Sequence, residues 1–164
     1  MANILVTGGA GYIGSHTCVE LLEAGHDVIV LDNLSNSSEE SLKRVQELTG
    51  KTLKFIQGDI RNQSDLDQIF SLYAIDAVIH FAGLKAVGES QQIPLTYFDN
   101  NISGSIQLVQ AMERANVFNL VFSSSATVYD EGNISPLDEL MPTGMPSNNY
   151  GYTKLIVEQL LEKL

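Results

Sequence analysis

The chain has 164 residues, 44% of them hydrophobic, and a formal net charge of -11. This length suits one domain, and the acidic balance argues against a nucleic-acid or anionic-membrane partner, because phosphates attract Lys and Arg. The only cysteine, Cys18, leaves no internal disulfide and favours a cytoplasmic location, and neither a signal-peptide pattern nor an apolar run of the ~18 residues that a membrane span needs is visible.

Short apolar runs rich in Val and Ile alternate with helical patterns. Runs of this kind indicate strands that are buried on both faces, as in parallel sheets. Strands followed by helices throughout predict an α/β chain with a doubly wound parallel sheet. The predicted strands are Asn3–Val6, Asp27–Asp32, Leu53–Gly58, Ala77–Gly83 and Asn119–Ser125.

Helix boundaries are predicted from capping residues. The first helix follows a glycine-rich turn, and Gly25 is expected to cap its end. Ser37 and Glu40 have the spacing of a capping box, which predicts the start of the second helix. Ser64 is expected to open the third helix.

The second half of the chain is predicted to hold a long helix, a loop and a final helix. A helical pattern runs through Ser105–Asn116 and belongs to a helical region over 91–116. Residues 130–148 are rich in Pro, Gly, Ser and Asn and are expected to form a loop, which at this length is often functional. The last helix is expected over Tyr150–Leu164.

A glycine-rich turn, TGGAGYIG, lies between the first strand and the first helix. Gly9, Gly11 and Gly14 fit G-x-G-x-x-G, and Gly8, Gly11 and Gly14 fit G-x-x-G-x-x-G. Glycines permit a tight turn, close approach of the backbone to a pyrophosphate, and close helix–sheet packing. The helix N-terminus adds N–H donors and a partial positive charge. A glycine turn can also serve packing alone, so its context decides.

Asp32 provides that context, because it ends the second predicted strand 18 residues after Gly14. A carboxylate at this place can bind the ribose hydroxyls of an adenosine. A turn residue before Asn33 is the alternative interpretation. The carboxylate would repel a 2′-phosphate, and no Arg or Lys follows it before Lys43. NAD is therefore favoured over NADP.

Two further groups of residues indicate proton-transfer chemistry. In YGYTK, Tyr150 and Lys154 are four residues apart and share one helix face. An ammonium beside a phenol lowers the pKa of the phenol, which can then take a proton from a hydroxyl. A half-exposed Tyr and a solvated Lys are the common alternative, but the glycine turn in the same chain favours catalysis. Ser123, Ser124 and Ser125 close the fifth strand, where ligands of doubly wound sheets bind.

The motifs TGGAGYIGSH, LDNLSNS, GDIR, HFAGLKAVGES, FSSSATVY and YGYTKLIVEQ together resemble the UDP-glucose 4-epimerases, a family of the extended short-chain dehydrogenase/reductase type. The resemblance covers residues 2–164, and HFAGLKAVGES is its most specific segment. It implies a Rossmann fold followed by a smaller C-terminal domain that binds the UDP-sugar. We therefore expect residues 1–164 to form a single NAD-binding domain, truncated before the substrate domain.

The resemblance also implies a set of site residues. Ser125, Tyr150 and Lys154 would be catalytic, and Thr127 would approach the sugar together with Ser125 and Tyr150. The cofactor pyrophosphate would meet Gly8, Gly11, Tyr12, Ile13 and Gly14. The adenosine ribose would be surrounded by Asp32, Asn33, Ser35, Asn36 and Ser37, and the adenine would be flanked by Asp59 and Ile60. The pocket past the fourth strand would be lined by Phe81, Ala82, Gly83, Lys85 and Asn100.

The activity that the resemblance implies is interconversion of UDP-galactose and UDP-glucose with a retained NAD. Tyr150 would remove the proton of the sugar 4-hydroxyl while hydride moves to nicotinamide, and the resulting 4-keto intermediate would accept hydride on its other face. A homodimer is expected through the helices at 91–116 and 150–164. Asp130 and Asn149 depart from the family pattern, which has Gly and frequently Pro at these places.

Three other interpretations remain open. A nucleotide-sugar dehydratase would need an Asp–Glu pair after Thr127, where Val128 and Tyr129 stand instead. A non-catalytic NAD-binding module would not need the Tyr/Lys pair. In the third interpretation, the chain as given binds NAD yet is inactive without a sugar-binding half. His80 is interpreted as structural, and the scattered histidines with one cysteine predict no metal site.

Overall fold

A computed structural model describes residues 1–130 and 132–164. Within these residues the chain divides into two compact units, which we call the first unit (Met1–Ala82 and Ile106–Ser123) and the second unit (Gly83–Ser105 and Ser124–Leu164). None of the helices that the described residues form is long and apolar enough to cross a membrane. The single domain expected over 1–164 stays a prediction.

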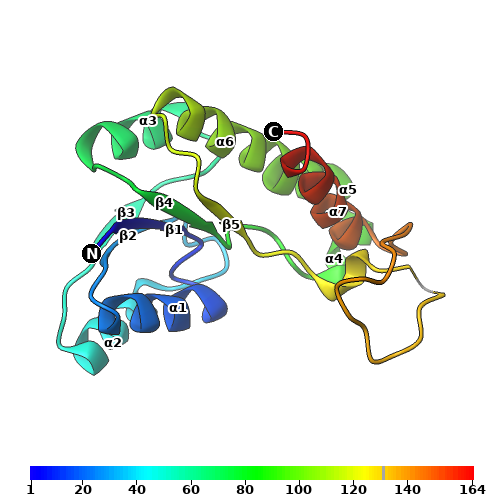
Figure 1. Cartoon of the computed structure of the whole chain (residues 1–164), viewed down its shortest axis with the longest axis horizontal. Coiled ribbons are helices and arrows are strands. Elements are labelled where there is room, and N and C mark those ends of the chain that lie inside the picture. The colour runs from blue at the N-terminus through cyan, green and yellow to red at the C-terminus, as the bar shows by residue number, and fades with distance from the viewer. Residues whose placement is uncertain (131) are drawn as a thin grey trace. The chain divides into compact units, whose positions relative to one another are not determined.

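The first unit contains a parallel sheet with helices on both faces (Figure 1). In the described residues, the sheet has five strands in the order β3-β2-β1-β4-β5. This arrangement confirms the predicted doubly wound α/β fold of the Rossmann type. The strands are β1 (Asn3–Thr7), β2 (Asp27–Asp32), β3 (Lys54–Gln57), β4 (Ala77–His80) and β5 (Leu120–Phe122).

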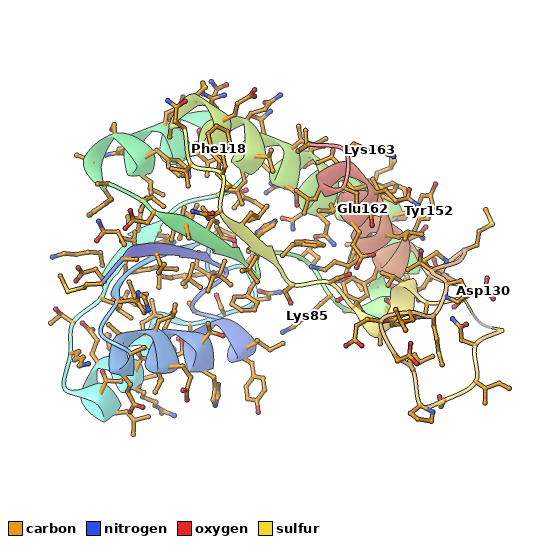
Figure 2. All side chains as sticks on the ribbon, viewed as in Figure 1. Lys85, Phe118, Asp130, Tyr152, Glu162 and Lys163 are labelled. Atoms are coloured by element: carbon orange, nitrogen blue, oxygen red, sulfur yellow. The ribbon has the colours of Figure 1, made fainter. Side chains whose placement is uncertain are left out.

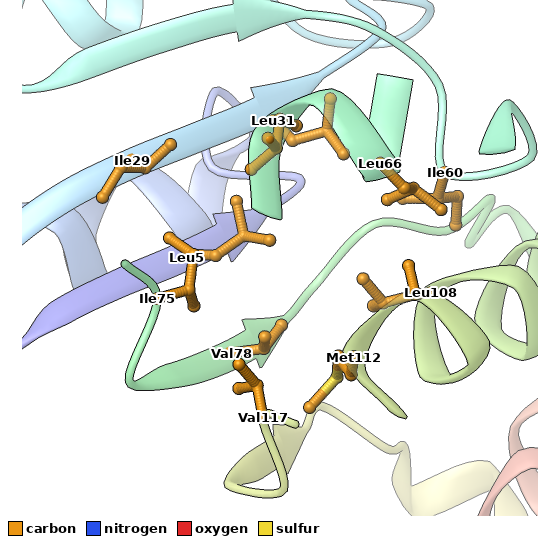
Figure 3. Close-up of a cluster of buried hydrophobic side chains, with 12 residues drawn as sticks. Leu5, Ile29, Leu31, Ile60, Leu66, Ile75, Val78, Leu108, Met112 and Val117 are labelled. Atoms are coloured by element: carbon orange, nitrogen blue, oxygen red, sulfur yellow. The ribbon is translucent and has the colours of Figure 1, made fainter. Parts of the chain in front are cut away.

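The sheet separates two apolar clusters, because successive side chains of a strand point to opposite faces. On one face, Leu5, Ile29 and Leu31 pack against α3 (Gln63–Leu72) and α6 (Gly104–Arg114), as Figure 3 shows. On the other face, the intervening residues of β1 and β2 pack against α1 (Tyr12–Glu23) and α2 (Glu39–Thr49). Burial on both faces explains why these strands read as unbroken apolar runs.

Two predicted helix starts are wrong by one or two residues. Ser38, not Ser37, caps α2, and its side chain accepts a hydrogen bond from the Glu40 N–H. Ser37 is unavailable because its hydroxyl donates to Asp32 at 2.7 Å. The start of α3 is set by Asn62, whose side chain accepts from the N–H of Ser64 inside the first turn. Local spacing identified the regions correctly, but a contact with Asp32 decided which serine caps α2.

The helical region over 91–116 is interrupted. It comprises α4 (Val87–Gln92), α5 (Pro94–Tyr97), the π-helix η1 (Phe98–Ser103) and α6. Pro94 lacks an N–H and begins a new helix. Asn116 takes a left-handed conformation, with φ of 57°, just past the end of α6. A π-helical turn inside a helical run is uncommon and often marks a functional site.

The loop and the last helix belong to the second unit. The described loop residues contain an isolated antiparallel bridge between Tyr129 and Thr143. The short 3-10 helix η2 covers Ala126–Val128. The last helix, α7, runs over Asn149–Leu161, close to the predicted span.

Candidate functional site

The glycine-rich turn of the first unit forms a cradle that has no room for side chains. Gly8 has φ of 71°, and a Cβ on it would lie 2.5 Å from the Ala82 nitrogen. A Cβ on Gly14 would lie 2.7 Å from the Cα of Gly9. Gly11 caps α1 without a side-chain hydrogen bond. The first N–H groups of a helix have no partner inside it, so these donors can bind the oxygens of a pyrophosphate.

The side chains beside this cradle point to backbone recognition. The Tyr12 and Ile13 side chains are 75% and 54% exposed, so they form no buried pocket. Both residues lie in the first turn of α1, where their N–H groups can donate to a ligand. Phe81 and Ala82 are partly buried against the apolar clusters of the first unit. The turn therefore fits a diphosphate held by main-chain donors.

Asp32 ties the cradle to the loop that follows β2. Its Oδ2 accepts from the Ala10 N–H at 3.0 Å, and its Oδ1 accepts from the Leu34 N–H at 2.9 Å and the Ser37 hydroxyl at 2.7 Å. Leu34 has φ of 59°, a conformation that non-glycine residues rarely adopt. The carboxylate is 7% exposed. It therefore orders both segments that the sequence assigns to pyrophosphate and ribose.

The loop after Asp32 continues this ordering. The Asn33 side chain accepts from the Ser35 N–H at 3.0 Å and donates to Asp59 at 3.0 Å. Ser35 and Asn36 are exposed. The structure thus places the predicted ribose residues in one loop of the first unit, next to one of the two predicted adenine residues.

Asp59 carries a partner that the sequence did not assign. Arg61 donates through Nε to Oδ1 at 3.0 Å and through Nη2 to Oδ2 at 2.8 Å. These bonds outweigh partial burial and hold the pKa of the Asp59 carboxyl well below its usual range. Ile60 is 5% exposed and packs in the core, so a ligand would meet its backbone. His80 is 2% exposed and its Nδ1 lies 2.6 Å from the Thr7 hydroxyl, as a structural histidine would.

In the second unit, α7 carries Tyr150 and Lys154. Asn148 caps this helix by accepting from the Gly151 N–H at 2.8 Å. Tyr150 is half-buried, whereas Lys154 is 6% exposed. Burial lowers the pKa of the Lys154 ammonium to about 8, and Glu158 partly opposes the shift. Tyr152 is 42% exposed and makes an edge contact with Phe98.

The hydroxyls of Ser125 and Thr127 form a hydrogen-bonded pair in the second unit. Ser125 caps η2, and its Oγ accepts from both the N–H of Thr127 at 3.2 Å and the hydroxyl of Thr127 at 2.9 Å. Gly151 lets α7 approach this pair, because a Cβ there would lie 2.8 Å from the Thr127 Oγ1. Within the described residues, the hydroxyls of Ser125 and Tyr150 are not hydrogen bonded to each other.

A network of buried amides joins η1 to Thr153, the residue before Lys154 in α7. Asn101 in η1 donates to the Leu84 carbonyl at 2.9 Å and to the Thr153 hydroxyl at 3.0 Å. Its carbonyl oxygen accepts from the Leu84 N–H at 2.8 Å and from the Asn100 amide at 2.9 Å. A Cβ on Gly83 would lie 3.3 Å from that oxygen and 3.8 Å from the Lys154 Nζ. The π-helix thus brings Gly83, Asn100 and Lys154 of the prediction together.

The remaining predicted residue, Lys85, is exposed and precedes α4 (Figure 2). Sequence reasoning gave no role to Ser90, Asn101, Gly151 or Arg61, although Ser90, Gly151 and Arg61 stand inside quoted motifs. In the described residues, no cluster of three or more His, Cys, Asp or Glu could hold a metal ion.

The sequence model of the NAD dependent epimerase/dehydratase family matches residues 4–164. The chain belongs to this family. It is 58% identical over 161 residues to a UDP-glucose 4-epimerase of Bacillus subtilis (strain 168), covering 98% of the chain and 47% of that relative. These comparisons confirm the resemblance found in the sequence motifs.

Solved structures of UDP-glucose 4-epimerases are similar to this chain in both sequence and fold. A UDP-glucose 4-epimerase from Stenotrophomonas maltophila with bound NAD and formylated UDP-arabinopyranose is 53% identical, with a TM-score of 0.95 over 99% of this chain and 48% of that one. A UDP-glucose 4-epimerase from Bifidobacterium longum in complex with NAD+ and UDP is 48% identical, with a TM-score of 0.96 over 98% and 48% of the two chains. The chain spans about half the length of these relatives.

Proposed function

We propose that the chain carries the NAD-binding and proton-transfer residues of a UDP-glucose 4-epimerase. The observation that supports this most is the pair on α7, where a half-buried phenol, Tyr150, shares a helix face with a buried ammonium, Lys154. Positive charge near a phenol favours the phenolate. The 58% identity to a UDP-glucose 4-epimerase and the NAD in related structures support the same proposal.

The residues present fit NAD. Gly8 and Gly14 permit the tight turn and the close packing of α1 that a pyrophosphate site of this kind uses, and the N-terminus of α1 supplies donors. Asp32 retains lone pairs for a ribose hydroxyl beside its three internal bonds. When bound, the cofactor would supply the group that accepts a hydride from the sugar carbon and returns it.

The protein would move and hold protons. Tyr150 would take the proton of the sugar 4-hydroxyl and return it once the configuration at that carbon has inverted. Ser125 accepts two hydrogen bonds from Thr127, so its own hydrogen is left to donate to the sugar oxygen. Lys154 would place positive charge near the phenol oxygen while the proton moves. The substrates would be UDP-galactose and UDP-glucose.

A coupled assay for UDP-glucose formed from UDP-galactose tests this proposal. It uses the purified 164-residue chain and the gene product that contains it, each with added NAD. We expect activity in the gene product and little in the chain alone. Tyr150→Phe should abolish the activity, and the exposed Tyr152→Phe should retain it. Formation of a dehydrated sugar instead of UDP-glucose would favour the dehydratase.

We also propose self-association through the helical region of the second unit. Ile93 and Leu95 are 41% and 79% exposed at the junction of α4 and α5. Contiguous exposed apolar patches mark protein–protein interfaces, and these two side chains would belong to such a patch. Sedimentation should show a dimer that Leu95→Glu weakens, and a monomeric wild type would contradict the proposal.

A further inference from the structure

Four hydrogen bonds among the described residues join α4 to the start of α7, and we call them the α4–α7 clamp. The Tyr150 N–H donates to the Ser90 hydroxyl at 3.1 Å. The Asn149 amide donates to the Ser90 carbonyl at 3.0 Å and to the Gln91 Oε1 at 2.6 Å. The Gln91 amide donates to the Ser147 carbonyl at 3.3 Å. The clamp joins residues that are 56 to 60 positions apart in sequence.

The clamp acts on a part of α7 that the helix itself cannot hold. N–H groups of a first turn lack an acceptor inside the helix. Asn148 satisfies the Gly151 N–H, whereas the Tyr150 N–H depends on Ser90. Ser90 is fully buried, and its hydroxyl donates to the Val87 carbonyl at 2.6 Å, which orients the oxygen toward Tyr150.

The α4 side of the clamp is itself anchored. The Tyr97 hydroxyl accepts from the Ala86 N–H at 3.0 Å and lies 2.7 Å from the Glu89 Oε2. Tyr97 is fully buried, and burial with help from Glu89 raises its pKa to about 12. This phenol therefore stays protonated and holds the N-cap residue and the first turn of a six-residue helix, so Ser90 has a rigid base.

We propose that Ser90 and Asn149 are positioning residues for the phenol of Tyr150. By holding the backbone of the first turn of α7, they set the place of the Tyr150 hydroxyl relative to Lys154, which is buried in the second turn. Misplacement of a reacting group by about 1 Å can cost roughly 100-fold in rate. This inference rests on the proposed function, in which Tyr150 transfers the proton.

Amide hydrogen exchange of the chain tests the contact itself. Ser90→Ala should accelerate exchange of the Tyr150 N–H by roughly tenfold, as expected for one lost hydrogen bond. The Leu155 N–H in the next turn should stay protected. Ser71→Ala is the matched control, because this serine also donates to a backbone carbonyl in its helix but lies in α3. Unchanged exchange at Tyr150 would overturn the proposal.

The place of the Tyr150 ring tests the positioning role without an activity assay. Comparing the nuclear magnetic resonance spectrum of Tyr150→Phe with that of the chain identifies the ring signals of Tyr150. In Ser90→Ala, these ring signals should shift, because the backbone that carries the phenol has lost its anchor on α4. Unmoved ring signals would overturn the positioning role even if the amide loses protection. This readout decides the question even if the gene product proves inactive and the proposed function fails.

Kinetics of the gene product complete the test. Ser90→Ala should lower kcat by roughly 10- to 100-fold and leave KM within about twofold, because geometry and not binding changes. Asn149→Ala should lower kcat less, and Asn149→Pro should recover part of that loss. Proline at the first helical position presets φ, and Asn148 before it is already extended, with ψ of 154°.

The Asn149 pair also decides the case if Ser90→Ala does not fold. A Pro variant that is no better than the Ala variant would mean that order in this turn does not limit the reaction, and would overturn the proposal. Equal kcat in all three variants and the wild type would do the same.

Discussion

The two units bury apolar and polar side chains in different proportions. The first unit is built on two apolar clusters, its described buried polar side chains are Thr7, Ser15, Asp32 and His80, and its glycine-rich turn offers backbone N–H groups. The second unit has few buried apolar side chains, namely Tyr97, Val128, Leu155 and Val157. Its other buried side chains are polar: Ser90, Asn100, Asn101, Ser105, Thr153 and Lys154.

This difference reflects the different requirements of a cofactor cradle and of an acid–base pair. A cofactor cradle needs a tight turn and exposed backbone donors, and here a single buried carboxylate, Asp32, anchors it at the edge of an apolar sheet. An acid–base pair needs fixed charges and hydroxyls, and these require hydrogen-bond partners once they are buried. We therefore expect the first unit to be sensitive to added atoms and the second to lost partners.

The largest effect is expected from Gly8→Ala. The new Cβ would meet the backbone of Ala82 at 2.5 Å in a left-handed residue, so neither neighbour can yield easily. The free energy of unfolding should fall by about 3 kcal/mol or more. Gly50→Ala is the control, because Gly50 has φ of 64° but open space around it; it should cost about 1 kcal/mol. Urea unfolding measures both, and equal losses would contradict the steric explanation.

The next effect is expected from Asn101→Leu, a change of similar volume. It leaves the Leu84 N–H, the Leu84 carbonyl and the Thr153 hydroxyl without this partner. The expected loss of stability is about 2–4 kcal/mol. Leu108→Met, in the apolar cluster of the first unit, should cost less than about 1.5 kcal/mol. Similar midpoints of thermal unfolding for the two variants would remove the proposed difference between the units.

A somewhat smaller effect is expected from the buried charge of Lys154. The folded pKa of about 8 lies below the usual 10.5, so between these values the unfolded chain binds more protons. Stability should therefore rise with pH from about 8 to 10.5. Lys154→Met should flatten this rise and, at pH 7, stabilise the chain by about 1–3 kcal/mol. Unfolding midpoints measured over this pH range test the prediction, and Lys43→Met, at an exposed lysine, is the control. If the rise in stability persists in Lys154→Met, a group other than Lys154 causes it.

The smallest effect is expected at the start of α2. Ser38→Ala removes the cap and should cost about 1 kcal/mol. Ser37→Ala should leave the helix start intact and instead free the loop that Asp32 orders. Amide exchange in the first turn of α2 distinguishes the two. Faster exchange in Ser37→Ala than in Ser38→Ala would restore the capping box first predicted from the sequence.

Much of the first unit could be predicted from local pattern. The buried runs that form β1 and β2 alternate around both apolar clusters, so hydrophobicity alone reveals them. Gly8, Gly14 and Asp32 could also be identified from the sequence, because the glycines fall at the spacing of a known turn and Asp32 ends a predicted strand. Three strands were predicted too long. At β4, the apolar Phe81 and Ala82 continue past the last ladder residue, whereas β3 and β5 are shorter than predicted at both ends.

The second unit was harder to predict. Ser90 and Asn149 meet across 59 residues, and Asn101 meets Thr153 across 52, so no local spacing encodes either contact. No feature of the amino-acid composition predicts the π-helix, although Pro94 indicates that the helical region is interrupted before it. Tyr150 and Lys154 were found only because both lie on one helix.

Asp32 has a consequence for cofactor choice. Its carboxylate is the shared acceptor for Ala10 in the cradle and for Leu34 and Ser37 in the following loop. A substitution that removed its charge to admit a 2′-phosphate would also release both segments. The proposed preference for NAD therefore cannot be switched toward NADP by a single change at Asp32. New anchors for two loops would be needed at once, which makes dinucleotide preference a property of the scaffold and a hard target for redesign.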